Sequence, residues 1–238
     1  MPRISVVIPV GPEPHHEQYL EECLASLRTQ TKQPDEILLV DDKHFDPRAL
    51  DTYRVSQGRD GVYRIDSGPF RGCDIWHSPW YLGVAHAFNF GVALAENECV
   101  FLLGADDRLF PECLEMCELI YEQNGQKSGY YYVGVEYSDG RLQSLPCSAA
   151  MVTKSLWKET RGFPTEVASG ASDAAFISML LGAKQEHLLV PVIPDKPLYW
   201  YRSHEQSDTA QRGPWQGVIL ATRDLVTERF KAQFEVPA

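Results

Sequence analysis

The sequence predicts an α/β fold with a mixed, mostly parallel sheet and helices on both faces. Residues 4–8 and 37–40 are apolar runs that flank a segment of helical periodicity. Strand, helix and strand within about 40 residues form a βαβ unit, in which the two strands are parallel. Residues 99–103 form a further apolar run of the kind that buried strands show.

Acidic residues follow two of these runs. Asp41 and Asp42 end the run at 37–40, and Asp106 and Asp107 follow the run at 99–103. Open α/β sheets bind ligands at the carboxyl ends of their strands. Adjacent carboxylates repel each other unless a cation lies between them, and a divalent cation that carries phosphates is the usual partner. The pairs therefore predict a site for a metal-bound nucleotide or another phosphorylated ligand.

The remaining elements of the first half follow in order. After a turn at residues 9–12, five apolar residues recur at helical spacing. They are Tyr19, Leu20, Cys23, Leu24 and Leu27. Residues 43–80 are less regular, with one short strand expected near 62–65. We expect a helix over 83–95, and another over 111–121 that begins with proline, as helix N-termini favour.

The second half is richer in strands. Residues 130–135 predict one strand, and residues 138–140 predict a hairpin turn. The remaining expected elements are listed in chain order: a short strand at 151–152, helices over 155–160 and 172–181, a strand over 188–193, and an amphipathic helix over 218–230. Because repeats and linker-like segments are absent from the sequence, we expect one domain over 1–238.

Composition narrows the function. The 238 residues are 44% hydrophobic and carry a formal charge of -11, which disfavours nucleic acid or an anionic membrane as partner without excluding a local basic site. The six cysteines form no C-x-x-C pair, so zinc is not expected and reduced thiols are. No signal peptide and no run of ~18 apolar residues is present. We therefore expect a soluble, cytoplasmic protein without a membrane span, and leave a homo-oligomer open.

Several segments match known motifs in order and spacing. They read ISVVIP at 4–9, LASLRTQT at 24–31, EILLVDD at 36–42, GVAHAFNFG at 83–91, FLLGADDRL at 101–109, GFP at 162–164, SD at 172–173 and YRSH at 201–204. This series resembles the motifs of family 2 glycosyltransferases. The resemblance implies the GT-A fold, with residues 1–110 as the nucleotide-sugar-binding half and residues 111–238 as the acceptor-binding half.

The resemblance also implies roles for single residues. Those placed on the donor are Pro9, Val10, Asn89, Asp41 and Asp42 for the nucleotide, Asp106 for the ribose, and Asp107 and His204 for Mn²⁺ or Mg²⁺ on the diphosphate. Asp173 aligns with the general base. The alternatives are an ordinary turn after the strand for Asp41 and Asp42, a surface histidine for His204, and a helix cap for Asp173.

Some positions depart from the family pattern. Gly104 replaces the first aspartate of the metal motif, Ser172 replaces the glutamate before the base, and Phe88 replaces a frequent arginine. We expect Trp76, Trp80 and Tyr81 to pack in the core, with stacking on a sugar or base as the alternative.

The sequence thus favours an inverting, metal-dependent transferase that moves a sugar from a nucleotide-sugar, with UDP preferred, to a hydroxyl acceptor. A glycan or small molecule is the favoured acceptor. The alternative is a catalytically degenerate GT-A module that binds nucleotide-sugar or glycan without turnover, which Gly104 and Ser172 favour. A sugar-phosphate nucleotidyltransferase needs a Gly-rich basic loop after the first strand, but residues 9–17 contain one glycine and no lysine or arginine.

Overall fold

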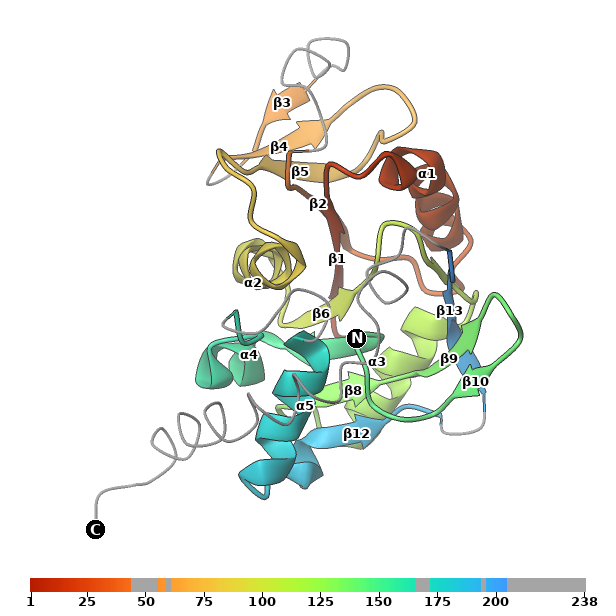
Figure 1. Cartoon of the computed structure of the whole chain (residues 1–238), viewed down its shortest axis with the longest axis vertical. Coiled ribbons are helices and arrows are strands. Elements are labelled where there is room, and N and C mark those ends of the chain that lie inside the picture. Colours follow the sequence, from red (N-terminus) through yellow and green to blue (C-terminus); the bar gives the residue numbers. More distant parts are fainter. Residues whose placement is uncertain (44–54, 59–60, 166–171, 194–195, 205–238) are drawn as a thin grey trace.

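The computed structural model describes residues 1–43, 55–58, 61–165, 172–193 and 196–204 (Figure 1). Within them a nine-stranded sheet forms the centre of the molecule. Its strands, in spatial order, are β12 (Leu189–Pro191), β8 (Tyr130–Tyr132), β11 (Ala150–Thr153), β6 (Cys99–Leu102), β1 (Ile4–Val10), β2 (Glu36–Asp41), β5 (Asp74–His77), β4 (Val62–Ile65) and β3 (Val55–Gln57). The helix expected over 218–230 lies outside the described residues.

The centre of this sheet is parallel. Strands β6, β1, β2 and β5 run in one direction, whereas β11 is antiparallel to both β6 and β8, and β4 is antiparallel to β5 and β3. The predicted α/β fold with a mixed, largely parallel sheet is confirmed. Because the central strands are parallel, their carboxyl ends meet at one edge.

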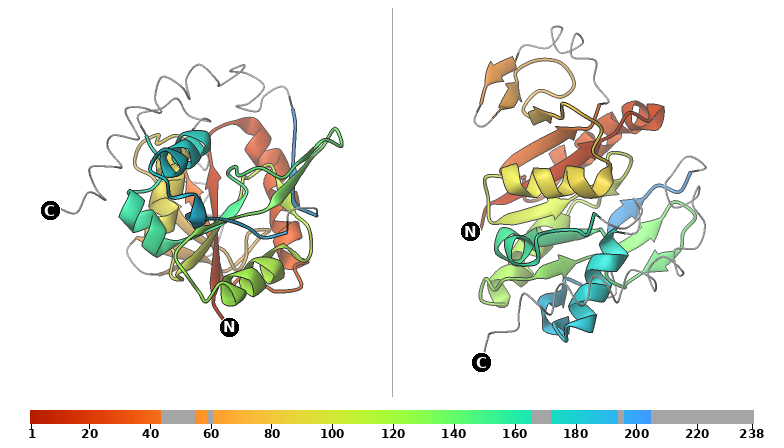
Figure 2. Two further views of the ribbon diagram at one scale, coloured as in Figure 1. Left: turned by 90° about the horizontal axis from the view of Figure 1, so that it is seen from below. Right: turned by 60° about the vertical axis from the view of Figure 1, so that its left-hand side comes forward.

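Helices cover both faces of the sheet (Figure 2). Helices α1 (Pro14–Arg28) and α3 (Cys113–Gln123) pack in one hydrophobic core, and α2 (Val84–Leu94), α4 (Lys154–Thr160) and α5 (Ser172–Gly182) pack in another. Strand β1 contributes side chains to both cores, because alternate side chains of a strand point to opposite faces. Ile8 contributes to the first core and Val7 to the second. A Cβ at Gly91 of α2 would lie 2.2 Å from Val7 Cγ1, so only glycine permits this close helix–sheet approach.

A smaller sheet lies beside the large one. Its order is β10 (Leu142–Gln143), β9 (Gly134–Tyr137), β13 (Pro197–Tyr201) and β7 (Arg108–Leu109). The single strand expected over 130–135 is wrong, because the chain changes sheet at Val133. The Val133 amide still donates to Ala149 O, but Gly134 already pairs with Pro197 of β13. The hairpin at 138–140 is confirmed between β9 and β10.

Two smaller differences concern local signals. Helix α3 begins at Cys113 rather than Pro111, because Pro111 lies in a turn whose carbonyl accepts the Thr31 amide at 2.8 Å. The irregular region up to residue 80 contains β3 and β5 as well as the expected β4. Among the described helices, none combines the length and apolar character needed to cross a membrane.

Candidate active site

Both acidic pairs lie at the carboxyl edge of the parallel strands. Val10 ends β1, Asp41 ends β2 and His77 ends β5, while the loop that carries Asp106 and Asp107 follows β6. The strand registers bring these ends together, since Val10 pairs with Asp41 and Asp41 pairs with His77. The structure thus places the predicted donor-side aspartates at one edge of the sheet.

Asp107 is held inside the protein. Its side chain is buried, and its carboxylate accepts hydrogen bonds from Tyr199 Oη at 2.5 Å and from the Arg202 amide at 2.8 Å. Burial raises the pKa of Asp107 well above its ordinary range, and the neighbouring Asp106 charge adds to this rise. Asp107 therefore joins the loop after β6 to β13 and to the segment that follows it.

Gly104 has a structural reason in this arrangement. A Cβ at this position would lie 2.6 Å from Asp107 Oδ2 and 3.2 Å from Asp106 Oδ1. The Gly104 amide also donates a hydrogen bond to Tyr199 Oη at 3.1 Å. An aspartate at position 104 would displace the two carboxylates that follow, so the departure from the family pattern fits the local packing.

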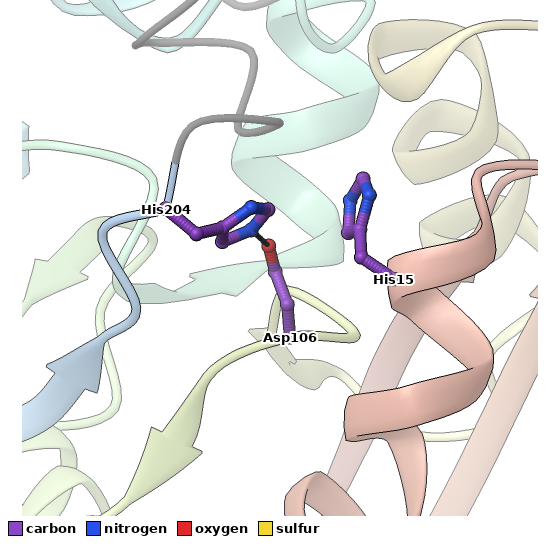
Figure 3. Close-up of side chains that lie close together, drawn as sticks. All are labelled: His15, Asp106 and His204. Atoms are coloured by element: carbon purple, nitrogen blue, oxygen red, sulfur yellow. Dashed lines mark hydrogen bonds and ion pairs between the residues drawn. The ribbon is translucent and has the colours of Figure 1, made fainter.

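Asp106 faces two imidazoles, one from each side of the edge (Figure 3). His204 Nε2 lies 3.0 Å from Asp106 Oδ2, and His15 projects from the first turn of α1 toward the same carboxylate. One ligand atom from each of the three lies within 4.8 Å of the others. Burial, followed by the neighbouring His16, lowers the pKa of His15, which favours its neutral form. We call His15, Asp106 and His204 the imidazole–carboxylate cluster; its donors could hold one divalent ion.

Arg202 places a positive charge beside this cluster. Its Nε donates to the Asp106 carbonyl at 2.9 Å, and its Nη2 lies 2.6 Å from Glu22 Oε2. The guanidinium carbon stacks 3.9 Å from the centre of the Tyr19 ring. These contacts fix the guanidinium in one orientation, where it can attract an anionic group at the edge.

The two aspartates of the first acidic pair have different hydrogen-bond partners. The Asp42 carboxylate accepts hydrogen bonds from the backbone amides of Leu82 at 2.5 Å and Gly83 at 2.7 Å, directly before α2. Burial raises the pKa of Asp42, although these two amides oppose the rise. Asp41 is also buried, and its Oδ2 lies 2.6 Å from His77 Nδ1. Asp42 therefore stabilises the start of α2. His77 lies on the solvent side of Asp41, because its side chain is the more exposed of the two.

Asp173 lies in the first turn of α5, which begins at Ser172 as the sequence predicts. Its carboxylate accepts the amides of Ser148 at 2.9 Å and Ala174 at 2.7 Å. Burial raises its pKa in spite of these hydrogen bonds. The Cys147 thiol, whose pKa burial raises to about 12, lies within electrostatic reach of both Asp173 and Asp107. Asp173 and Asp107 thus both raise the pKa of one thiol, and the role of Asp173 as general base stays a prediction.

The other predicted donor contacts have structural partners. Pro9 and Val10 are buried in β1, and the Val10 carbonyl accepts the Asp42 amide at 2.9 Å. The Asn89 amide group bonds Phe163 twice, to its carbonyl at 3.0 Å and from its amide at 2.8 Å. Asn89 therefore ties α2 to the loop after α4. Its contact with a donor stays a prediction.

The aromatic residues before α2 do not all pack in the core. Trp80 and Tyr81 are 62% and 58% exposed, so the expected core packing is wrong for both. Trp76 stacks on Phe90 with ring centroids 5.2 Å apart. Phe88, at the position of the family's arginine, is buried against Phe163.

Sequence reasoning missed His15, His77 and Tyr199. His15 stands at an ordinary proline-led helix start, so nothing local marks it. Tyr199 lies 92 residues from the carboxylate it holds. The one usable signal was at His77, which ends a short β-like run as Asp41 does.

Comparisons with known proteins agree on one family. A family model described as Glycosyl transferase family 2 matches residues 5–156. The O-antigen biosynthesis protein RfbC of Myxococcus xanthus is 32% identical over 120 residues, which cover 50% of this chain and 8% of that protein. Glycosyltransferase GlyG of Streptococcus pneumoniae serotype 4 is 29% identical over 145 residues, covering 58% and 42%. The chain thus spans less than half the length of these two relatives.

Solved structures support the fold. The crystal structure of S. aureus TarS 1-349 in complex with UDP-GlcNAc superposes with a TM-score of 0.66 at 18% identity, over 97% of this chain and 72% of that one. The same TarS fragment in complex with UDP gives 0.64 at 18% identity, over 96% and 70%. At this identity the likeness shows a shared GT-A fold.

Proposed function

Because this chain belongs to glycosyltransferase family 2, we propose that it transfers a sugar, with inversion, from a nucleotide-sugar to a hydroxyl acceptor. UDP is the preferred nucleotide. The observation that carries the proposal is the shared sheet edge, where two acidic pairs, histidines and an arginine converge. We assign residues 1–110 to the donor and residues 111–238 to the acceptor. A relative named for O-antigen biosynthesis supports a glycan acceptor.

We propose Asp106, in place of Asp107, as the ligand for Mn²⁺ or Mg²⁺. Asp107 is buried and already accepts two hydrogen bonds, whereas Asp106 faces His204. Asp106 and His204 would hold the ion, which would supply positive charge for the diphosphate leaving group. Arg202 adds a fixed positive charge beside it. The ribose contact of Asp106 stays a prediction.

Asp41 and His77 form the proposed nucleobase site. An imidazole that donates its Nδ1–H to Asp41 presents Nε2 outward as an acceptor. Uracil carries a donor at N3 that fits this acceptor, whereas cytosine N3 and adenine N1 are themselves acceptors. The site therefore favours UDP, since a mismatched base leaves a polar group unpaired.

Asp173 is the proposed general base. The acceptor hydroxyl oxygen attacks the anomeric carbon, its proton passes to the Asp173 carboxylate, and the nucleoside diphosphate leaves. Burial raises the pKa of this carboxyl, which makes it a stronger base once it is ionised. The two backbone amides that it accepts fix its orientation at the start of α5.

The degenerate-module alternative rested on Gly104 and Ser172. The packing around Gly104 gives that glycine a structural reason, so Ser172 is the departure that still favours the alternative.

Turnover separates the two functions. A panel of UDP-sugars is incubated with the protein and Mn²⁺, and release of UDP is measured with and without glycan acceptors. We expect release by the wild type and a ~10²–10⁴-fold lower rate for Asp173→Asn. Asp139→Asn, in the exposed β9–β10 hairpin, is the matched control and keeps the wild-type rate. UDP binding without release by any variant would support the binding module instead.

A further inference from the structure

His15 is placed where it can serve as a ligand. It is the second residue of α1, after Pro14, and only 7% of it is exposed. The α1 helix therefore carries this ring into the edge of the sheet from the donor half. His204 approaches the same carboxylate from the segment after β13 (Figure 3). Two distant parts of the chain thus contribute one imidazole each.

The ring of His15 has little other use in the fold. Within the described part of the chain it contacts two other imidazoles and takes part in no hydrogen bond. Its centroid lies 4.4 Å from that of His16 and 4.6 Å from that of His204. By contrast, His16 has a partner, because its Nδ1 accepts the Gly11 amide at 2.9 Å. A nearly buried imidazole beside a carboxylate, whose ring nitrogens make no hydrogen bond to any described residue, has the features of a metal ligand.

We propose that His15 is a metal ligand, and that the imidazole–carboxylate cluster selects a first-row transition ion such as Mn²⁺, Co²⁺ or Zn²⁺ over Mg²⁺. This inference rests on the proposed metal role of Asp106 and His204. Two imidazoles and one carboxylate form a donor set that suits such ions. Mg²⁺ prefers oxygen ligands in octahedral geometry and gives up water reluctantly, so a set with two nitrogens disfavours it.

A second consequence concerns the order of binding. The family resemblance implies two protein ligands, Asp107 and His204, for an ion on the nucleotide diphosphate. Here His15, Asp106 and His204 each place one donor atom within 4.8 Å of the others. The protein should therefore bind the ion without nucleotide, and the ion should join α1 to the segment after β13.

Titrations with Co²⁺ and Mg²⁺ in the absence of nucleotide test the proposal. Visible absorption reports the Co²⁺ ligands, and calorimetry gives the affinity for each ion. We expect the wild type to bind Co²⁺ at least about tenfold more tightly than Mg²⁺, with nitrogen ligation in the spectrum. Equal affinities, or no Co²⁺ binding without nucleotide, would overturn the proposal.

Two variants separate ligation from ring packing. His15→Phe keeps a ring against His204 but removes the donor nitrogens, and we expect it to lose at least ~10–100-fold in Co²⁺ affinity. His15→Gln serves the same purpose if the Phe variant does not fold. His86→Ala, on the exposed side of α2, is the control and should bind as the wild type does.

Co²⁺ binding that survives both changes at His15 would show that the ring only packs, and would contradict the proposal. A failure of UDP to bind the Co²⁺-loaded wild type would count against the proposed transferase function alone. The two ideas therefore fail separately.

Discussion

The two acidic pairs at the sheet edge share a sequence pattern but differ in the surroundings of their first aspartates. In each pair the second aspartate serves the fold: Asp42 binds the amides before α2, and Asp107 binds Tyr199 and Arg202. In each pair the first aspartate meets a histidine. Asp41, however, is buried behind His77, whereas Asp106 is partly exposed between two imidazoles.

This difference suggests different ligands for the two pairs. A buried carboxylate behind one histidine presents a hydrogen-bonding group of fixed direction, which suits a nucleobase. A partly exposed carboxylate between two histidines presents converging lone pairs, which suits an ion. The same Asp-Asp pattern thus gives two kinds of site, because the neighbours come from different elements.

The largest expected effect breaks the structural half of the second pair. Asp107→Ala removes the acceptor of Tyr199 Oη and of the Arg202 amide, and an unpaired buried donor costs about 1–3 kcal/mol. We expect urea unfolding to show a loss of stability in this range. Asp106→Ala, which removes a ligand-facing carboxylate, should lose clearly less. Equal losses would show that the two aspartates are not divided in this way.

The next effect tests the ligand half of the first pair. We expect UDP to bind at least about tenfold more tightly than CDP or ADP, which corresponds to ~1.4 kcal/mol. His77→Phe should remove most of this preference while it leaves the fold intact. Calorimetric titration of the three diphosphates in Mn²⁺ measures it. If His77→Phe kept the preference for UDP, the Asp41–His77 pair would not be the site that recognises the base.

Asp42 gives a smaller and purely structural effect. Asp42→Ala leaves two amides at the start of α2 without their acceptor, and the loss of such a cap costs about 1 kcal/mol. Asp42→Asn can still accept a hydrogen bond and should lose less. Thermal unfolding of the two variants checks the order, and UDP selectivity that changed with the Asn variant would contradict a purely structural role.

The smallest effect distinguishes the two structural aspartates by pH. Burial raises the pKa of Asp107, so the unfolded chain releases this proton at lower pH than the folded protein does. Above the ordinary pKa of 3.8 the folded state binds more protons, and stability falls as pH rises toward the folded pKa. Asp107→Asn should remove this fall. Asp42→Asn should change the profile less, because the pKa of Asp42 is raised less far than that of Asp107. Urea unfolding at several pH values measures both profiles. A larger change for Asp42→Asn than for Asp107→Asn would contradict this prediction.

The sequence predicted most of the fold because its signals are local. Periodicity and apolar runs located α1, α2, α5 and the parallel strands β1, β2 and β6, and the turn at 138–140 located a hairpin. The strand over 130–135 was predicted as one because its residues are uniformly β-favouring. What divides it is the pairing of Gly134 with Pro197, which no local pattern encodes.

The candidate site was predictable in its positions but not in its contacts. Strand ends and family motifs indicated Asp41, Asp42, Asp106 and Asp107. Which aspartate of each pair faces a ligand depends on residues far along the chain, such as Arg202, which lies 95 residues from Asp107. His15 escaped for the same reason.

Mn²⁺-dependent UDP binding by two single variants tests the division of labour most directly. Calorimetry on Asp106→Asn and Asp107→Asn, each first shown to be folded, compares their UDP affinity with and without Mn²⁺. We predict that Asp106→Asn loses the Mn²⁺-dependent gain and that Asp107→Asn keeps it. If Asp107→Asn lost this gain while Asp106→Asn kept it, the buried aspartate would be the ligand and the account would be wrong.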